Sequence, residues 1–160
     1  MSNSGDTALS ARAVAEKVHL MVQGTHGIDF ADLFAPDGVL EYPFAPPMMP
    51  RRLEGRDTIR AYRSNVSRVR AMFDMEGSSA HIHETADPDV VIVEIEHHGT
   101  SHVTGKPYRI IAVGVIEVRN GQIVSYRDYM DPLAVAQLTG RIPQLVDALN
   151  ADEGAAAKPA

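Results

Sequence analysis

The chain has 160 residues, 44% of them hydrophobic, which is typical of one globular domain with a buried core. Its formal net charge of −6 at pH 7 argues against general nucleic-acid binding, because phosphate recognition needs a basic surface. The chain has no cysteine, which excludes disulfides, a thiolate nucleophile and cysteine-ligated metals. No segment resembles a membrane span or a signal peptide, so we expect a cytoplasmic protein.

The first part of the chain is predicted to be mainly helical. Residues 7–23 are expected to form a helix with one apolar stripe, made of Val14, Val18, Met21 and Val22. A short helix over 29–34 is expected to end at the turn-like segment 35–38. A strand over 39–44 follows, and then a Pro/Met-rich loop over 45–50 that we expect to cover a surface or a pocket mouth.

A longer helix is predicted over residues 57–73, with an apolar stripe of Ile59, Tyr62, Val66, Val69 and Phe73. It overlaps a stretch, residues 51–70, that holds seven of the fifteen Lys/Arg residues: Arg51, Arg52, Arg56, Arg60, Arg63, Arg68 and Arg70. Because the opposite stripe is apolar, these arginines are interpreted as a solvated helix face or a partner contact.

The second half is predicted to be mainly β. Strands are expected over 77–86, 89–100, 107–119 and 122–130, the last two joined by the hairpin signal Asn120-Gly121. Two helices, 132–139 and 142–150, are expected to follow, and the small, polar tail 151–160 is predicted to be disordered.

These elements predict a single α+β domain over residues 1–150, in which helices pack on one face of a curved antiparallel sheet. Such an arrangement makes a cone-shaped cup. The inside of a cup of this kind is a natural place for a small-molecule pocket.

Several motifs resemble the SnoaL-like branch of the nuclear-transport-factor-2-like superfamily, a group that includes polyketide cyclases, ketosteroid isomerase and the phenazine-biosynthesis A/B proteins. The motifs are Phe34-Ala35-Pro36-Asp37-Gly38, Leu53-Glu54-Gly55-Arg56-Asp57, Asn120-Gly121 and Tyr126-Arg127-Asp128-Tyr129-Met130-Asp131-Pro132. Their spacing is most similar to that of the phenazine proteins. The resemblance implies the fold strongly and the reaction weakly, because this fold hosts many chemistries.

The resemblance also implies roles for particular residues. Asp128 matches the position of an interior acidic residue that acts as acid or base in several members. Tyr42 stands where ketosteroid isomerase carries its proton-abstracting aspartate, so steroid isomerisation is not expected. Ile95 and His97 stand where limonene epoxide hydrolase, another member of the group, carries an Arg-x-Asp pair, so its water-activating mechanism is not expected. Ile110, Ala112 and Gly114 stand in place of polar pocket residues of the phenazine proteins, which implies a less polar substrate than theirs.

Asp128 is the best candidate acid/base by its own surroundings as well. If Asp128 points into the cup, strand alternation sends Tyr126 and Met130 inward with it and Arg127 outward. Burial among apolar side chains would raise the pKa of the carboxyl group toward neutrality. The alternatives are an ion pair with an arginine, such as Arg109 or Arg127, or a cap on the helix that starts at Pro132.

Other side chains are candidates for the same site. His97 lies on an apolar strand face and is a possible general base near Asp128, or else a hydrogen-bonded core histidine. Tyr42 is a possible hydrogen-bond donor to a substrate carbonyl, or else a rim tyrosine. The substrate-binding lining is predicted to be Tyr126, Met130, Ile95, Ile110, Ala112, Gly114, Tyr62 and Met21.

A metal site is the competing interpretation of the histidines. His81 and His83 form an H-x-H pair, which on a strand would point both rings to one face. Their alternation with Ala80 and Ile82 indicates an exposed face, so we expect no metal.

The sequence thus predicts a cofactor-independent acid/base enzyme, of the cyclase, isomerase, dehydratase or condensation type, acting on a small, largely apolar carbonyl compound of secondary metabolism. The alternative is a non-catalytic small-molecule binder that uses the same pocket. We expect a homodimer with no nucleic-acid or membrane partner.

Overall fold

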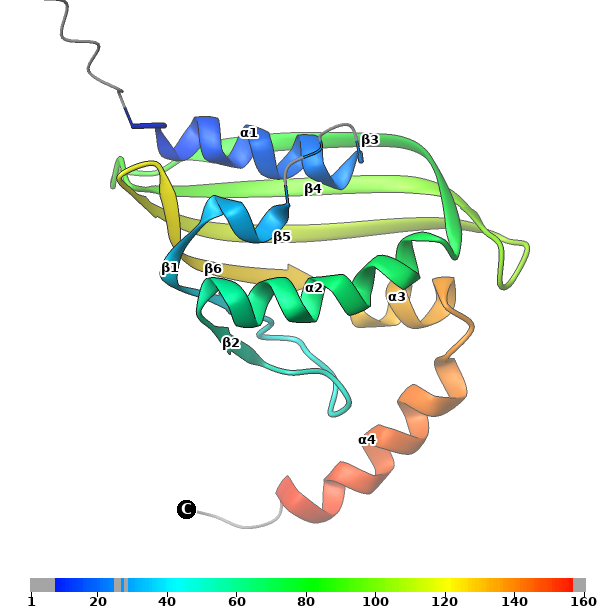
Figure 1. Cartoon of the computed structure of the whole chain (residues 1–160). Helices are drawn as coiled ribbons and strands as arrows, with labels where there is room; N and C mark the ends of the chain where they lie inside the picture. Colours follow the sequence, from blue (N-terminus) through cyan, green and yellow to red (C-terminus); the bar gives the residue numbers. More distant parts are fainter. Residues whose placement is uncertain (1–7, 25–26, 28, 157–160) are drawn as a thin grey trace, which may run out of the picture.

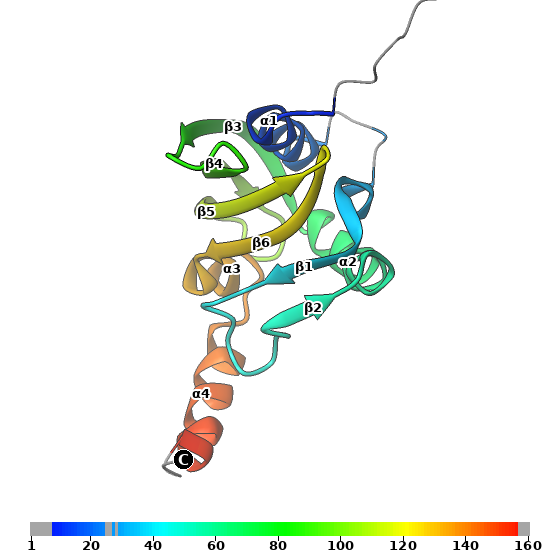
Figure 2. The same cartoon turned by 90° about the vertical axis from the view of Figure 1, so that its left-hand side faces the viewer.

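The computed structural model describes residues 8–24, 27 and 29–156, without the side chains of residues 66, 67 and 152–156. Six strands form one curved sheet, with two long helices on its inner face (Figures 1 and 2). The predicted α+β cup is confirmed. No helix in the described part of the chain is long and apolar enough to cross a membrane.

The sheet has the strand order β2-β1-β6-β5-β4-β3. Its strands are β1 (Phe34–Glu41), β2 (Arg52–Glu54), β3 (Phe73–Glu84), β4 (Val90–Ser101), β5 (Pro107–Arg119) and β6 (Gln122–Met130). The expected four-strand meander is present as β3 to β6, and all its pairs are antiparallel. The sheet continues beyond it, because β1 pairs parallel with β6 and antiparallel with β2.

β1 differs from the sequence-based expectation. It starts at Phe34 and runs through residues 35–38, which were expected to form a turn before the strand. The turn-like residues instead produce an irregularity in the pairing of β1 with β6 between Phe34 and Val39. A Cβ atom on Gly38 would lie 2.7 Å from the carbonyl oxygen of Ile123, so the glycine permits the close approach of the two strands.

The helices are α1 (Ala11–Val22), the 3₁₀ helix η1 (Phe30–Leu33), α2 (Arg56–Arg70), α3 (Pro132–Leu138) and α4 (Ile142–Ala156). α1 starts at the N-cap Ser10 and buries Val14 and Val18, as its stripe predicts. α2 ends at Arg70, so Phe73 opens β3 rather than closing the helix. α4 continues six residues past the expected boundary at 150, and residues 157–160 of the expected tail lie outside the described residues.

Turns and caps fix how the cup closes. Asn120 and Gly121 both have positive φ, 51° and 75°, as the predicted hairpin between β5 and β6 requires. Asp131 caps α3 by accepting hydrogen bonds from the backbone N–H groups of Leu133 and Ala134.

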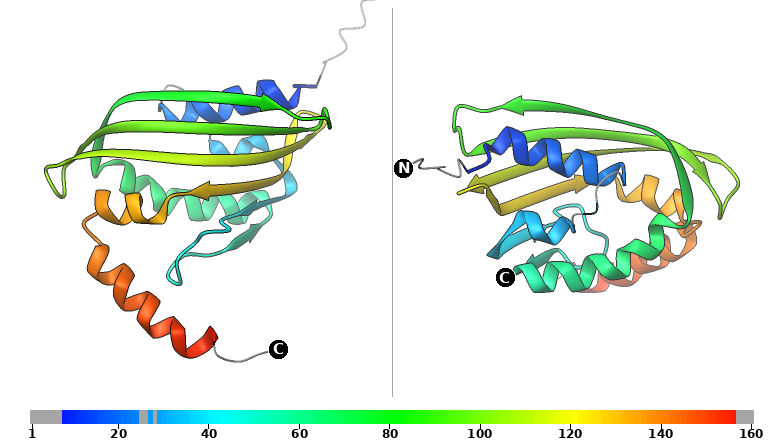
Figure 3. Two further views of the ribbon diagram at one scale, coloured as in Figure 1. Left: turned by 180° about the vertical axis from the view of Figure 1, so that it is seen from behind. Right: turned by 45° about the horizontal axis from the view of Figure 1, so that its top comes forward.

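Buried residues form two clusters on the inner face. The larger lies between α1, η1, β1 and the central strands, and it includes Phe34, Leu40, Tyr42, Val93 and Tyr126. The smaller lies at the other end of β3 to β5, beneath α3, and is made of Phe73, Ile110 and Leu138. Seen from behind, the outer face of β3 to β6 carries no helix of the described chain, and α4 extends away from the body (Figure 3).

Candidate active site

Asp128 lies on β6 with its side chain in the larger cluster. Its neighbours on the same strand face are Tyr126, which is 5% exposed, and Met130, which packs against the cluster. Arg127 is exposed on the other face, so the side chains alternate as strand geometry predicts. The Oδ1 atom of Asp128 is buried and has no hydrogen-bond partner among the described residues.

Burial changes the acidity of this carboxyl group. Desolvation raises the pKa of Asp128 to about 6, and the charge of Arg63 opposes that rise. The two structural roles considered for Asp128, an ion pair with an arginine such as Arg109 and the cap of α3, are filled by other residues. Arg109 forms a two-point ion pair with Glu96 at 2.7 and 2.8 Å, and Asp131 caps α3.

Tyr42 is brought level with Asp128 by the parallel pairing of β1 and β6. Leu40 pairs with Tyr126, and Glu41 pairs with Arg127. The residues that follow them, Tyr42 and Asp128, are therefore at matching positions. Tyr42 is 4% exposed, and its ring lies 6.1 Å from that of Tyr62. Burial raises the pKa of the Tyr42 phenol well above its ordinary value, while Arg63 opposes the rise through its charge and a hydrogen bond.

Tyr126 lies beside Asp128 on the same face of β6. Its ring stacks near Phe34 at 6.4 Å and meets Phe30 at 5.9 Å, and burial raises the pKa of its phenol far above the ordinary value. Gly114, the partner of Asp128 on β5, lies directly under this ring. A Cβ atom there would lie 2.7 Å from Cε2 of Tyr126. Gly114 therefore makes room for Tyr126 itself.

Arg63 is the site residue that sequence reasoning missed. It lies on α2, half-buried, with its guanidinium 4.6 Å from the centroid of the Phe30 ring. A signal was present, because Arg63 follows the buried Ile59 by four residues and so shares its helix face. The arginines of residues 51–70 were interpreted together as a solvated helix face, so the different position of Arg63 was not recognised.

His97 lies on the same sheet face but in the other cluster. His97 pairs with Ile110 on β5, whereas Asp128 pairs with Gly114 on the same strand. The two residues are therefore two strand spacings and four positions apart, which is about 16 Å for regular sheet spacings. The expected proximity of His97 to Asp128 is therefore wrong. Its Nδ1 lies 3.3 Å from the Tyr108 hydroxyl, its ring stacks on Phe73, and burial lowers its pKa.

The other predicted lining residues divide between the two clusters. Ile95 is buried in the larger cluster, and Met21 and Tyr62 are partly buried against it. Ala112 pairs with Met130 beside Asp128. Ile110 belongs to the smaller cluster with His97.

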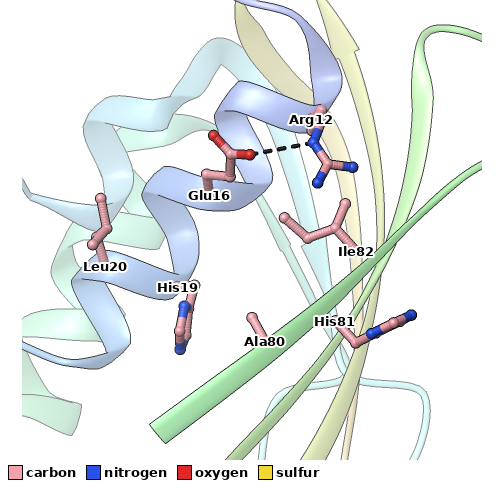
Figure 4. A pocket seen from close by; sticks show the side chains of 7 residues that line it. All are labelled: Arg12, Glu16, His19, Leu20, Ala80, His81 and Ile82. Atoms are coloured by element: carbon pink, nitrogen blue, oxygen red, sulfur yellow. Dashed lines mark ion pairs between the residues drawn. The ribbon is translucent and has the colours of Figure 1, made fainter.

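The H-x-H pair on β3 lies outside the cup. His81 and His83 are both exposed, and His83 Nε2 lies 3.2 Å from a carboxylate oxygen of Glu94. Within the described ranges, no three His, Asp or Glu side chains are grouped so that they could hold a metal ion. A shallow groove runs between α1 and β3 (Figure 4). It is lined by Arg12, Glu16, His19, Leu20, Ala80, His81 and Ile82.

The groove lies at the edge strand β3, and Asp128 on β6 does not line it. Its apolar floor is Ala80 and Ile82, and the charged pair Arg12 and Glu16 forms its edge (Figure 4). The candidate catalytic groups are thus the buried carboxylate of Asp128 and the phenols of Tyr42 and Tyr126. None of these three residues lines the groove.

Comparison with known proteins decides the family. The SnoaL-like domain model matches residues 14–126, which is most of the chain and runs from within α1 to the middle of β6. The chain belongs to the SnoaL-like family. This SnoaL-like protein is 38% identical, over 114 residues, to an uncharacterized PhzA/B-like protein of Pseudomonas aeruginosa, and the match covers 71% of this chain and 78% of the relative.

Solved structures place the fold in the same group. A Bacillus subtilis protein provisionally named an isomerase is 30% identical, with a TM-score of 0.71 over 82% of this chain and 93% of its own. A phenazine biosynthesis-related protein of Pseudomonas aeruginosa is 19% identical, with a TM-score of 0.59 over 88% and 87% of the two chains. The latter likeness shows the shared fold. The predicted resemblance to the SnoaL-like branch and to the phenazine proteins is confirmed.

Proposed function

We propose that this SnoaL-like protein is a cofactor-independent acid/base enzyme that acts next to the carbonyl group of a small, largely apolar metabolite. The observation that carries the proposal is the Oδ1 atom of Asp128, buried and without a hydrogen-bond partner among the described residues, beside the phenol of Tyr42. A buried carboxylate without a partner is costly, so a role for its free oxygen is needed to explain it.

The proposed chemistry uses each group in the protonation state that its pKa favours. With a pKa of about 6, Asp128 is mostly ionised at pH 7 to 8 and accepts a proton from the carbon next to the carbonyl. The electron pair of that C–H bond moves into an enolate. The Tyr42 phenol, protonated because its pKa is raised, donates a hydrogen bond to the enolate oxygen. Asp128 then returns the proton to the same or a neighbouring carbon.

The surroundings suit a largely apolar substrate. Three methionines, Met21, Met49 and Met130, are partly buried against the cluster, and flexible thioethers adapt readily to a ligand. The names of the relatives, an isomerase and a phenazine biosynthesis-related protein, are consistent with small-metabolite chemistry and support this proposal. A cytoplasmic location belongs to the same proposal.

The test needs no knowledge of the natural substrate. The protein is incubated in D₂O with a panel of cyclic ketones, and the loss of α-proton signals is followed by NMR. We expect the wild type to accelerate exchange for at least one ketone. Asp128→Asn should lower that rate by roughly 10² to 10⁴, the usual effect of losing a general acid/base. The exposed Asp147→Asn on α4 is the matched control and should keep the rate.

A non-catalytic binder is the second candidate, and the position of His97 favours it. The histidine expected to assist Asp128 lies in the smaller cluster, so Asp128 is accompanied by phenols rather than by a second base. A ketone that binds wild type and Asp128→Asn equally well, with exchange accelerated by neither protein, would replace the enzyme proposal with this one.

We also propose a homodimer formed through the outer face of the sheet. Apolar side chains from three adjacent strands meet there: Ile92, Ile111, Val113, Val115 and Tyr129. Ion pairs surround them, including that of Arg109 with Glu96. An apolar centre with a charged rim is the usual composition of an interface between copies.

A further inference from the structure

The groups assigned to the chemistry lie beneath the surface of the protein. Tyr42 and Tyr126 are both buried, and the Oδ1 atom of Asp128 is buried with them. A substrate larger than water therefore reaches Asp128 only when a part of the surrounding wall moves. In enzymes with closed sites, loops commonly make this movement.

The loop of residues 43–50 is the part of the wall that directly follows Tyr42. Its base is closed by a hydrogen bond from the backbone N–H of Tyr42 to the carbonyl oxygen of Arg51, at 2.9 Å. A turn within the loop is closed by the N–H of Met49, which donates to the carbonyl oxygen of Pro46, also at 2.9 Å. The loop is thus a compact unit connected to the sheet at its base, so it can move as a unit about that base.

One side of this loop contacts the core, and the other side is exposed. Met49 packs against the cluster that contains Tyr42, and Ala45 is buried in the same cluster. Met48 is 54% exposed, and Phe44 is 62% exposed. The closed position of the loop therefore depends on a few inward contacts, and segments held in this way open more readily than core strands.

The space into which the loop can move lies on its outer side. Pro47 and Met48 lie across a gap of about 330 Å³ from Ala148 and Ala151 of α4. α4 extends away from the body of the protein at this end (Figure 3). Because the two α4 residues have small side chains, they leave the gap between helix and loop unfilled.

We propose that the loop of residues 43–50 is the gate through which a substrate reaches Asp128, and that it opens outward into the gap beside α4. This rests on the proposed acid/base function, because only then does a substrate need to reach Asp128. Tyr42 stays in position when the gate opens, since its hydrogen bond to Arg51 lies at the base of the loop.

The experiment measures access to position 128 and needs no catalysis. The chain has no cysteine, so Asp128→Cys introduces a single thiol at the position of the proposed base. The small, neutral reagent methyl methanethiosulfonate modifies this thiol, and mass spectrometry follows the rate. When the loop opens and closes faster than the thiol reacts, the rate is proportional to the open fraction of the protein.

Two further substitutions, each combined with Asp128→Cys, change the gate in opposite directions. Met49→Ala removes an inward contact of the closed loop. The rate should then rise about tenfold or more, as expected from the loss of a partly buried methionine side chain. Ala148→Phe fills the gap on the outer side of the loop, so the rate should fall several-fold.

Each of these substitutions has a matched control. Ile82→Ala shortens another side chain that is partly buried against the same cluster, but at the groove between α1 and β3. Val146→Phe adds the same ring to α4 at a residue outside the lining of the gap, about 200° around the helix from Ala148. Both controls should keep the rate of the Asp128→Cys protein.

Several results would overturn the gate. They are a thiol that does not react in any variant, an unchanged rate in Met49→Ala, and an equal increase in Ile82→Ala. An unchanged rate in Ala148→Phe would overturn the outward opening. If Asp128→Cys does not fold, Met130→Cys on the same strand face replaces it as the reporter.

Failure of the proposed function would look different from failure of the gate. Ketone exchange that survives in Asp128→Asn would remove the base, whereas the rates of thiol modification would be unaffected, because they report access alone.

Discussion

A single carboxyl group links the chemistry of this protein to its stability. In the unfolded chain Asp128 has an ordinary pKa near 3.8, and burial raises it to about 6 in the folded protein. Between these values the folded state holds a proton that the unfolded state has lost, so stability falls as pH rises and then levels off above about 6. The difference of the two pKa values corresponds to a cost of about 3 kcal/mol at pH 8.

Asp128→Asn should therefore unfold at higher denaturant concentration than wild type at pH 8. The gain in unfolding free energy should reach at most about 3 kcal/mol, less the cost of burying an amide, and it should disappear near pH 4. Urea unfolding of both proteins at several pH values measures it. A gain that is independent of pH would show that the Asp128 carboxyl group is not desolvated.

Residue-scale features were only partly predictable from the sequence. Strand alternation predicted the inward direction of Asp128, and with it Tyr126 and Met130, because side chains on one strand alternate strictly. The neighbours across strands were not predictable in this way. The placement of Tyr42 depends on a parallel pairing of β1 with β6, and the distance to His97 depends on the register of three strands.

At the scale of elements, β5 and β6 hold the site by a close contact between Gly114 and Tyr126. Gly114→Ala would place a Cβ atom 2.7 Å from the Tyr126 ring, which is buried and packs against Phe30 and Phe34. We expect a loss of about 1–3 kcal/mol in unfolding free energy, the usual cost of overpacking a core. Thermal unfolding measures it, with Gly27→Ala as control, because a Cβ atom on Gly27 meets no described atom within 4 Å.

Element boundaries were predicted well where local chemistry sets them. The Asn120-Gly121 hairpin and the start of α3 at Asp131-Pro132 follow from turn and capping preferences. β1 was predicted to start too late, because Ala35-Pro36-Asp37-Gly38 has the composition of a turn. Pairing with β6 overrides that local preference and carries the strand back to Phe34.

At the scale of the whole molecule, the uncovered outer face of the sheet predicts association. Light scattering at micromolar concentration should give twice the chain mass of 17.4 kDa. Val113→Arg, at the centre of the apolar group, should shift the protein toward the monomer, while Leu9→Arg, the same kind of change at an exposed leucine just before α1, should not. A wild-type mass of one chain would contradict the homodimer.

The proposed function depends on Asp128 acting as a base, and the pH dependence of ketone exchange tests this role most directly. Exchange catalysed by wild type should rise with pH, with a midpoint near 6, as the Asp128 carboxyl group loses its proton, and it should then stay constant. Asp128→Asn should show neither the rise nor the plateau. A wild-type rate without a midpoint near 6, or the same profile in both proteins, would contradict the role of Asp128 as the base.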